Sequence, residues 1–131
     1  MVIDSHTLLW WLDGDARLSA EGRRIMDNEA AGPDRLVVSA VTFWELRLKE
    51  IRSKLTPKRP VNTWPKAIRS LPRMRIEEVT LGDWLCVAEM NWENRDPADR
   101  IIAATAIRLG MPVVTVDEKF HGEVSPVEVV W

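Results

Sequence analysis

The chain has 131 residues, of which 46% are hydrophobic and 29% charged. This length suits one domain, residues 1–131, with a sizeable core, and the composition is typical of a soluble globular protein. A single cysteine, Cys86, excludes an intramolecular disulfide and favours a reducing cytoplasm. No apolar run is long enough to cross a membrane, and residues 1–4 lack the features of a signal peptide. We therefore expect a cytoplasmic protein with no membrane segment.

The net charge of −2 conceals a strong separation of charge along the chain. Residues 47–75 carry a charge of +9 and contain a single acid, Glu50, whereas the remainder carries −11. The ten basic residues of this stretch are Arg47, Lys49, Arg52, Lys54, Lys58, Arg59, Lys66, Arg69, Arg73 and Arg75. Such a region suits a polyanion, and it is equally compatible with two helices that have solvated basic faces.

The first half of the chain predicts two strands, each followed by helices. An apolar strand at residues 1–3 leads into a helix at 6–12, capped by Asp4 or Ser5, and a second helix follows over 22–28, ending near Gly32-Pro33. Leu36-Val37-Val38 is a continuous apolar run that ends at Ser39, typical of a strand buried on both faces. The helix after it has apolar positions at helical spacing, namely Val41, Trp44, Leu48 and Ile51.

The second half continues the alternation. A helix is predicted over 64–71, a weak strand over 75–79, and a helix from Thr80 with one apolar side made by Leu81, Trp84, Leu85, Ala88 and Trp92. A further helix runs from Pro97 to Leu109, and strands are predicted at 113–116 and 127–130, with a turn near 119–122 between them. This order favours an α/β fold with a mostly parallel sheet and helices on both faces.

Acidic residues follow the predicted strands. Asp4 follows the first strand, Asp117 follows residues 113–116, and Glu45 lies in the second turn of the helix after residues 36–39. Asp96 and Asp99 begin the helix that leads to Asp117. Because ligands in open α/β sheets bind beyond the carboxyl ends of the strands, we expect these acids to share one edge.

Each acid also has a structural interpretation. Asp4, Asp96 and Asp117 can cap helices or turns, and Glu45 can form an ion pair with Lys49 one helical turn later. A shared cluster would repel itself, and a divalent cation would remove that repulsion. Hard oxygen ligands without zinc-type spacing favour Mg²⁺ or Mn²⁺. Such ions suit phosphate chemistry, and the chain contains no nucleophile or phosphate-loop motif.

Four segments resemble the VapC-type PIN-domain toxins of bacterial toxin–antitoxin pairs, in the same order along the chain. They are Ile3-Asp4-Ser5-His6-Thr7-Leu8-Leu9-Trp10-Trp11-Leu12, Ser39-Ala40-Val41-Thr42-Phe43-Trp44-Glu45-Leu46, Arg95-Asp96-Pro97-Ala98-Asp99-Arg100-Ile101-Ile102-Ala103-Ala104-Thr105-Ala106, and Val114-Thr115-Val116-Asp117 with the closing Val129-Val130-Trp131. Asn94 and Ala98 depart from the residues that the family commonly has there.

The resemblance implies a three-layer α/β/α fold and an endoribonuclease that depends on Mg²⁺ or Mn²⁺. Its metal-binding and catalytic acids would be Asp4, Glu45, Asp99 and Asp117. Asp96 would cap a helix, and the hydroxyls of Ser5 and Thr115 would support the acids.

The same resemblance implies an RNA substrate, hydrolysed to a 5′-phosphate and a 3′-hydroxyl, a small VapB-like antitoxin that covers the acids, and a homodimer. Residues 47–75 would guide the RNA, since an acidic site alone repels it. Of the seven tryptophans, Trp11, Trp44 and Trp84 are expected in the core, and Trp64 is the candidate for stacking on a base.

Two other hypotheses remain open at this point. His6 and His121 could act as a metal-free acid–base pair, which would cleave RNA in EDTA. Alternatively, the chain could be a catalytically idle PIN-like module that binds RNA or a partner. Phosphoacceptor domains fit poorly, because Asp4 is followed by Ser5 and His6, where those domains have a second acid.

Overall fold

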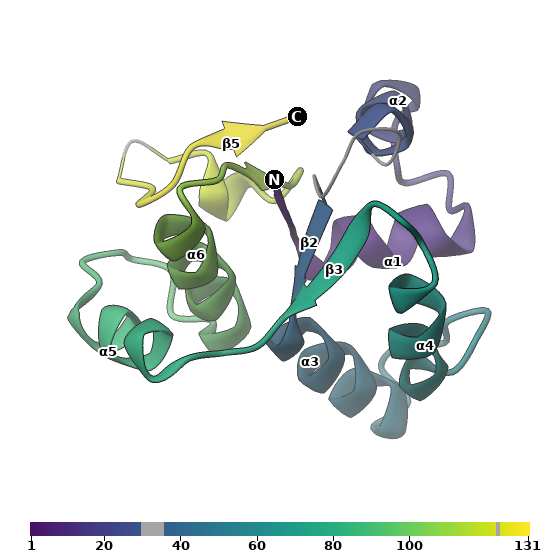
Figure 1. The fold of residues 1–131 in the computed structure, drawn as a ribbon, viewed down its shortest axis with the longest axis horizontal. Coiled ribbons are helices and arrows are strands. Elements are labelled where there is room, and N and C mark those ends of the chain that lie inside the picture. The colour runs from purple at the N-terminus through teal and green to yellow at the C-terminus, as the bar shows by residue number, and fades with distance from the viewer. Residues whose placement is uncertain (30–35, 123) are drawn as a thin grey trace.

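The centre of the protein is one sheet of five parallel strands (Figure 1). The computed structural model describes residues 1–29, 36–122 and 124–131. The strand order is β3-β2-β1-β4-β5, and all four pairings are parallel. The strands are β1 (Val2–Ile3), β2 (Leu36–Ser39), β3 (Met74–Glu77), β4 (Val113–Val114) and β5 (Val129–Val130).

Successive residues of the three central strands point to opposite faces of the sheet. Val2, Val37 and Val113 belong to one core cluster, whereas Ile3, Val38 and Val114 belong to the other. All six side chains are fully buried. This explains why β1, β2 and β4 are apolar without alternation, since both of their faces are covered.

Helices cover both faces of the sheet, which confirms the predicted α/β/α arrangement. The face that contains Ile3 is covered by α1 (Ser5–Asp13), α2 (Ala20–Glu29), α3 (Ala40–Ile51), the turn η1 (Val61–Thr63) and α4 (Trp64–Arg69). The opposite face is covered by α6 (Pro97–Leu109) and the turn η2 (Glu118–Phe120), and α5 (Leu81–Glu89) packs against α6 (Figure 1).

The predicted helix ends follow from their capping residues. Asp4 caps α1, with its Oδ2 accepting from the backbone N–H of His6 at 3.2 Å. Asp96 caps α6 through Oδ1, which accepts from the N–H groups of Ala98 and Asp99. Gly110 ends α6 with a φ of 62°, a left-handed conformation that favours glycine. The predicted end near Gly32-Pro33 lies outside the described residues.

The orientation of α5 differs from the prediction. Leu81, Trp84 and Leu85 were expected to face the core, yet they are 75%, 54% and 56% exposed. The helix instead buries Asp83, which bonds with Arg108 of α6 at 2.9 Å and completes a capping box with Thr80. A buried ion pair and a cap therefore decide which side of α5 faces inward, and periodicity alone carries no signal for this choice.

The apolar positions of α3 also divide differently from the prediction. Val41 is buried, but Trp44 and Ile51 are 55% and 65% exposed. The inward side instead contains Thr42, Glu45 and Leu46. The helix packs against α6, η1 and β2, and the face that it presents to them differs from the predicted stripe.

The strand order reverses its direction of growth at β1. The chain adds β2 and β3 on one side of β1 and then returns to place β4 and β5 on the other. Such a switch point creates a crevice outside the carboxyl ends of the two neighbouring strands, here β1 and β4. In the described part of the chain, no helix has the length and apolar character needed to span a membrane.

Candidate acidic site

The four predicted acids lie around this crevice. Asp4 directly follows β1 and is 2% exposed, and Asp117 lies beyond β4, where it caps η2. Glu45 comes from α3 and is 7% exposed, and Asp99 comes from the first turn of α6 and is 6% exposed. Three carboxylates are thus buried together, each supplied by a different element of the fold.

Burial and mutual repulsion perturb two of these carboxylates. Burial, followed by the negative charges of Glu45 and Asp117, raises the pKa of Asp4 from 3.8 to about 6. Burial also raises the pKa of Asp99 to about 6, with further contributions from the charges of Asp96, Asp4 and Glu45, against a hydrogen bond that lowers it. These interactions show that the acids are electrostatic neighbours, which strongly perturbed carboxylates at functional sites often are.

Glu45 is both paired and incompletely satisfied. Its Oε1 accepts from Nζ of Lys49 at 2.6 Å, the ion pair that the sequence offered as a structural interpretation. Its Oε2 is buried and has no hydrogen-bond partner. A buried carboxylate oxygen without a partner is costly, so this atom is available for a further cation or donor.

The two hydroxyl residues hold the surrounding backbone and helices. Oγ1 of Thr115 accepts from the backbone N–H of Asp117 at 3.0 Å, and therefore fixes the turn that carries this acid. Oγ of Ser5 donates to Oγ1 of Thr42 at 3.3 Å, which links α1 to α3. Both side chains therefore act on the positions of the elements that carry the acidic residues.

Two positioning residues were not recognised from the sequence. Nδ2 of Asn94 donates to Oδ2 of Asp99 at 2.8 Å, although Asn94 had been noted only as a departure from the family pattern. The buried guanidinium of Arg100 donates to the carbonyls of Val87, Met90, Trp92 and Asn94, at 2.7–2.9 Å. Arg100 thereby holds the connection between α5 and α6 in the shape that presents Asn94 to the site.

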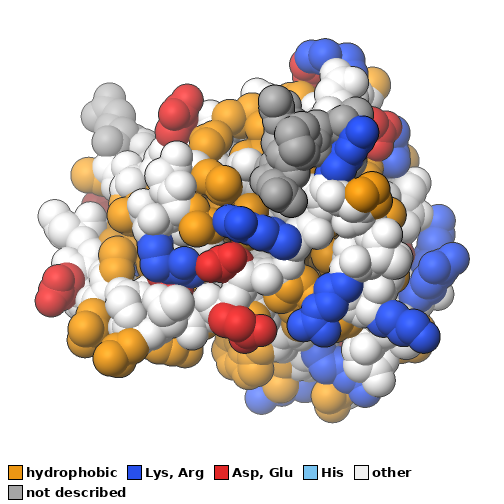
Figure 2. Space-filling model, viewed as in Figure 1, with side chains coloured by type: hydrophobic (Ala, Val, Ile, Leu, Met, Phe, Trp, Pro, Cys, Tyr) orange, Lys and Arg blue, Asp and Glu red, His pale blue; other side chains and the backbone are white. Residues whose placement is uncertain are grey.

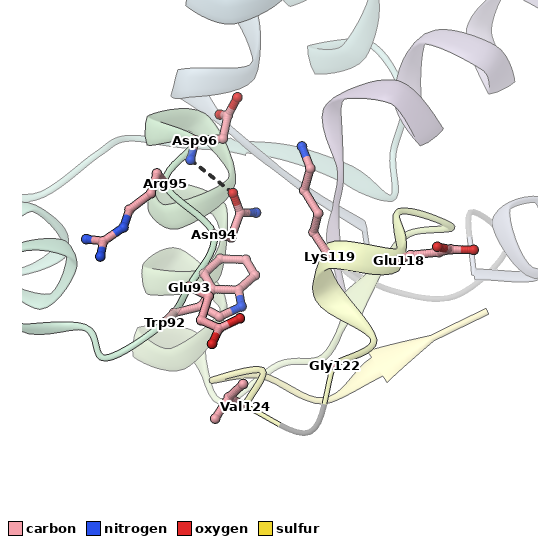
Figure 3. Close-up of a pocket in the computed structure, with 9 residues that line it drawn as sticks. All are labelled: Trp92, Glu93, Asn94, Arg95, Asp96, Glu118, Lys119, Gly122 and Val124. Carbon is pink, nitrogen blue, oxygen red and sulfur yellow. Dashed lines mark hydrogen bonds between the residues drawn. The ribbon is translucent and has the colours of Figure 1, made fainter.

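A cleft of about 630 Å³ adjoins the acids on this side of the molecule (Figure 3). One wall is the loop that contains Trp92, Asn94 and Asp96, and the other is formed by η2 and the residues after it, including Lys119. Figure 3 shows the Lys119 side chain opposite Asn94, whose Oδ1 accepts from the backbone N–H of Asp96. The cleft is therefore bordered by the loop that precedes α6, the helix of Asp99, and by the turn that follows Asp117.

The side chains of this cluster have the chemistry of a site for a hard divalent cation. All the donors are carboxylate oxygens, one of them is buried without a partner, and the charges repel one another. Among the described residues, however, no three His, Cys, Asp or Glu side chains are already close enough to hold a metal ion. The ammonium of Lys49 pairs with one of the acids, Glu45.

The two histidines occupy different surroundings. Burial and the charge of Lys49 lower the pKa of His6. The nearby charges of Glu45, Asp99 and Asp117 oppose this change but are weaker. Nε2 of His121 donates to the carbonyl of Thr115 at 3.0 Å. Within the described residues no hydrogen bond or ring contact joins the two side chains, so the geometry does not favour the histidine-pair hypothesis.

The prediction that Trp64 stacks on a base is wrong. Trp64 is only 3% exposed, and its Nε1 donates to the carbonyl of Arg59 inside the core cluster of α4. Trp44 and Trp84, which had been expected in the core, are instead half-exposed. Trp11 is partly buried against the core, and its Nε1 donates to Asp27.

The basic stretch reaches the acidic site at one point. Lys49, Arg52 and Lys54 line a groove of about 190 Å³ together with Glu45, Asp96 and neighbouring residues. Other cations of the stretch, such as Lys66 and Arg69, lie exposed on α4, and Figure 2 shows basic side chains over this part of the surface. The basic stretch therefore divides between solvated cations on α4 and three cations beside Glu45, and binding of a polyanion by the latter stays a prediction.

Comparison with known proteins places the chain in a family. The family model described as "PIN domain" matches residues 1–122, and the chain therefore belongs to the PIN-domain family. The chain is 29% identical to Ribonuclease VapC22 of Mycobacterium tuberculosis over 127 residues, which covers 96% of this chain and 93% of that protein.

Solved structures share the fold at lower identity. VapBC2 of Rickettsia felis, crystallised with a DNA fragment from its promoter, has a TM-score of 0.68 at 16% identity, covering 98% of this chain and 96% of the other. FitAcB of Neisseria gonorrhoeae has a TM-score of 0.68 at 22% identity, covering 99% and 96%. These likenesses confirm the α/β/α architecture of the PIN type.

Proposed function

We propose that this chain is a metal-dependent endoribonuclease and the toxin of a toxin–antitoxin pair. The observation that carries the proposal is the cluster of three buried carboxylates, Asp4, Glu45 and Asp99, with the partly exposed Asp117 beside them at the carboxyl edge of the sheet. The name of the relative from M. tuberculosis, a VapC ribonuclease, supports the reaction class. The similar folds of VapBC2 from Rickettsia felis and of a toxin–antitoxin complex from Klebsiella pneumoniae support the biological setting.

The four acids would hold Mg²⁺ or Mn²⁺, which supplies Lewis-acid polarisation of the phosphate and acidifies a water molecule. Asp4, Asp99 and Asp117 would provide most of the oxygen ligands, and Glu45 would complete the set and orient the attacking water. Asn94 would keep Asp99 oriented, since its amide donates to Oδ2. Hydrolysis by water would leave a 5′-phosphate and a 3′-hydroxyl. For the carboxylates to converge, Glu45 has to release or share Lys49.

The partners follow from the same proposal. The RNA would approach along the groove that contains Lys49, Arg52 and Lys54, because these cations offset the repulsion between phosphates and acids. A small VapB-like antitoxin would cover the acids with its C-terminal segment. A second copy of the chain would pack on the exposed leucines of α5 and on Ile107 of α6, which is 46% exposed. A cytoplasmic location remains a prediction from the single cysteine.

The test is cleavage of total cellular RNA by the purified protein with Mg²⁺ or Mn²⁺, compared with EDTA and with an Asp99→Asn variant. Discrete fragments that disappear in EDTA and in the variant are the expected result. Asp96→Asn is the matched control, since asparagine caps a helix as well as aspartate does. It should retain cleavage, because Asp96 is not among the proposed ligands.

Two outcomes would contradict the proposal. Cleavage that persists in EDTA and in Asp99→Asn would exclude the acidic mechanism and return attention to the histidines. RNA binding without cleavage in either metal, from protein free of any bound partner, would indicate a catalytically idle PIN-like module. The 5′-phosphate ends can be checked by ligation of an adaptor, which fails on a 5′-hydroxyl.

A further inference from the structure

Lys119 lies in the turn η2, shortly after Asp117, and its side chain extends into the cleft of about 630 Å³ beside the acidic site (Figure 3). In the described part of the chain its ammonium forms no ion pair. Arg95 is the other cation among the described lining residues, but Figure 3 shows its side chain pointing away from the cleft. Lys119 therefore supplies the positive charge that this cleft presents to a ligand.

The backbone position of Lys119 is fixed by its neighbours. Its N–H donates to Oδ1 of Asp117 at 3.0 Å, and the N–H of Phe120 donates to the carbonyl of Asp117 at 2.9 Å. The ring of Phe120 is fully buried and meets the ring of Trp92 edge to face, with centroids 5.0 Å apart. Because Trp92 belongs to the opposite wall, this contact holds the two walls of the cleft together. A ligand thus has to order only the side chain of Lys119.

The cleft continues into the cationic groove at Asp96. This residue lines both cavities, and it directly precedes the first turn of α6, where Asp99 lies. The groove contributes the cations Lys49, Arg52 and Lys54. Positive charge is therefore present in both of the cavities that meet at the start of α6. A polyanion that passes over the acids meets cations before and after them, which offsets the repulsion of its phosphates.

We propose that Lys119 binds an RNA phosphate next to the phosphate that is cleaved. The inference rests on the proposed function, because it takes RNA as the substrate of the acidic site, and it adds the contact that fixes where the strand leaves that site. Among the described residues, none of the four proposed metal ligands lines the cleft. The phosphate held there is therefore a neighbour of the scissile one, whose charge the metal would neutralise.

The side chains of the cleft make Lys119 the donor for this phosphate. Asn94 lies on the opposite wall, but its amide already bonds to Asp99 and to the backbone N–H of Asp96. The exposed ammonium of Lys119 has three donor hydrogens, which suits a phosphate oxygen. The leucines of α5 and Ile107, which are proposed for a second copy, are not among the described lining residues, so the two assignments use different parts of the surface.

Binding of a short RNA oligonucleotide that contains a bond cleaved by the parent protein tests the contact. It is measured in Mg²⁺ with the full chain and Asp99→Asn as background, so that the RNA stays intact. Adding Lys119→Met should weaken binding roughly fivefold, which corresponds to about 1 kcal/mol for an exposed ion pair. The slope of log affinity against log salt should decrease by about 0.7–0.9, the counterion release of one phosphate contact. Lys119→Arg should bind like the background protein, because it keeps the charge.

Arg95→Met is the matched control. It removes the same charge from the same lining, but from a side chain that points away, and it should change the affinity by less than about twofold. Oligonucleotides with one uncharged methylphosphonate at successive positions then locate the phosphate. One substitution next to the cleaved bond should weaken binding as much as Lys119→Met does, and the two changes together should cause no further loss.

Three results would overturn the proposal. The first is an unchanged affinity in Lys119→Met. The second is an equal loss in Lys119→Met and Arg95→Met, which would show a general effect of charge and no particular contact. The third is a loss from Lys119→Met that adds to the loss from every methylphosphonate, because a direct contact requires one position at which the two losses coincide.

Kinetics of the active protein separate this contact from the proposed function. Without the Asp99→Asn background, Lys119→Met should raise KM about fivefold and leave kcat and the apparent Mg²⁺ affinity unchanged, since Lys119 holds neither the metal nor the scissile phosphate. Metal-dependent cleavage with an unchanged KM refutes the contact alone. A parent protein that never cleaves RNA refutes the proposed function, and the contact with it.

Discussion

Replacing Asp4 by asparagine should change how the stability of the metal-free protein depends on pH. Asp4 is 2% exposed, and its pKa is raised from 3.8 to about 6 by burial and by Glu45 and Asp117. The folded protein therefore binds this proton more tightly than the unfolded chain. Protonation of Asp4 therefore stabilises the folded state. This contribution to the free energy of unfolding is fully present below about pH 4 and is lost as the pH rises through 6.

The magnitude follows from the size of the pKa change. About two units at 1.36 kcal/mol each correspond to about 3 kcal/mol, of which about 2 kcal/mol is lost between pH 4 and pH 7.5. Asparagine keeps the cap on α1, because its side-chain oxygen can still accept from the N–H of His6. Between pH 4 and pH 7.5 the free energy of unfolding of Asp4→Asn should thus rise by about 2 kcal/mol relative to that of the parent, because only the parent loses this contribution.

Urea unfolding in EDTA at the two pH values measures this difference. Comparing the same two proteins at both pH values cancels any cost of the amide that does not depend on pH. Asp27→Asn is the control, since Asp27 is an exposed carboxylate remote from the site and should show no such change. If the stability difference between Asp4→Asn and the parent is the same at pH 4 and pH 7.5, the electrostatic account of the cluster is wrong. Adding Mg²⁺ at pH 7.5 should stabilise the parent and have less effect on the variant.

Three further variants test the surroundings of the acids. Asn94→Ala should weaken the apparent Mg²⁺ affinity in a cleavage titration by about 10- to 100-fold, because Asp99 loses the donor that orients it; an unchanged titration would contradict this role. Lys49→Met should destabilise the protein in EDTA and increase its stabilisation by Mg²⁺ in thermal unfolding, because Glu45 loses the ammonium that pairs with it. Equal stabilisation of the variant and the parent by Mg²⁺ would mean that Lys49 does not compete with the metal. Arg100→Met should lower the free energy of urea unfolding by at least about 3 kcal/mol, since several backbone carbonyls lose their donor. A loss below about 1 kcal/mol would show that the connection between α5 and α6 keeps its shape without the guanidinium.

Much of the fold could be predicted because its central strands are buried on both faces. The apolar runs at β1, β2 and β4 and the caps at Asp4, Asp96 and Gly110 are local signals. The positions of the acids followed from the same signals, since the end of a parallel strand determines the edge of the sheet at which the next residue lies.

The parts that could not be predicted depend on contacts between distant residues. The sequence around α5 contains an apolar stripe, but Asp83 turns inward because Arg108, 25 residues later, provides its partner. Similarly, Trp64 is buried because the carbonyl of Arg59 accepts its N–H and the core of α4 surrounds it. The importance of Asn94 could have been noticed from its distance of five residues from Asp99, although only the structure shows that the two side chains meet.

The capping and metal-binding interpretations of the acids do not exclude each other. Asp4 caps α1, Asp117 caps η2, and Asp99 lies in the first turn of α6. Unpaired N–H groups at helix starts stabilise negative charge, so these three carboxylates are partly compensated by the backbone. Glu45 lies beyond the first turn of α3 and lacks this compensation, and it is the acid that binds Lys49. The backbone N–H groups at a helix start thus compensate a carboxylate that is also placed to bind a metal ion. Glu45 has no such N–H groups, and its charge is compensated by Lys49. The site should therefore depend on Lys49 only while the metal is absent, which the Lys49→Met comparison in EDTA and Mg²⁺ measures directly.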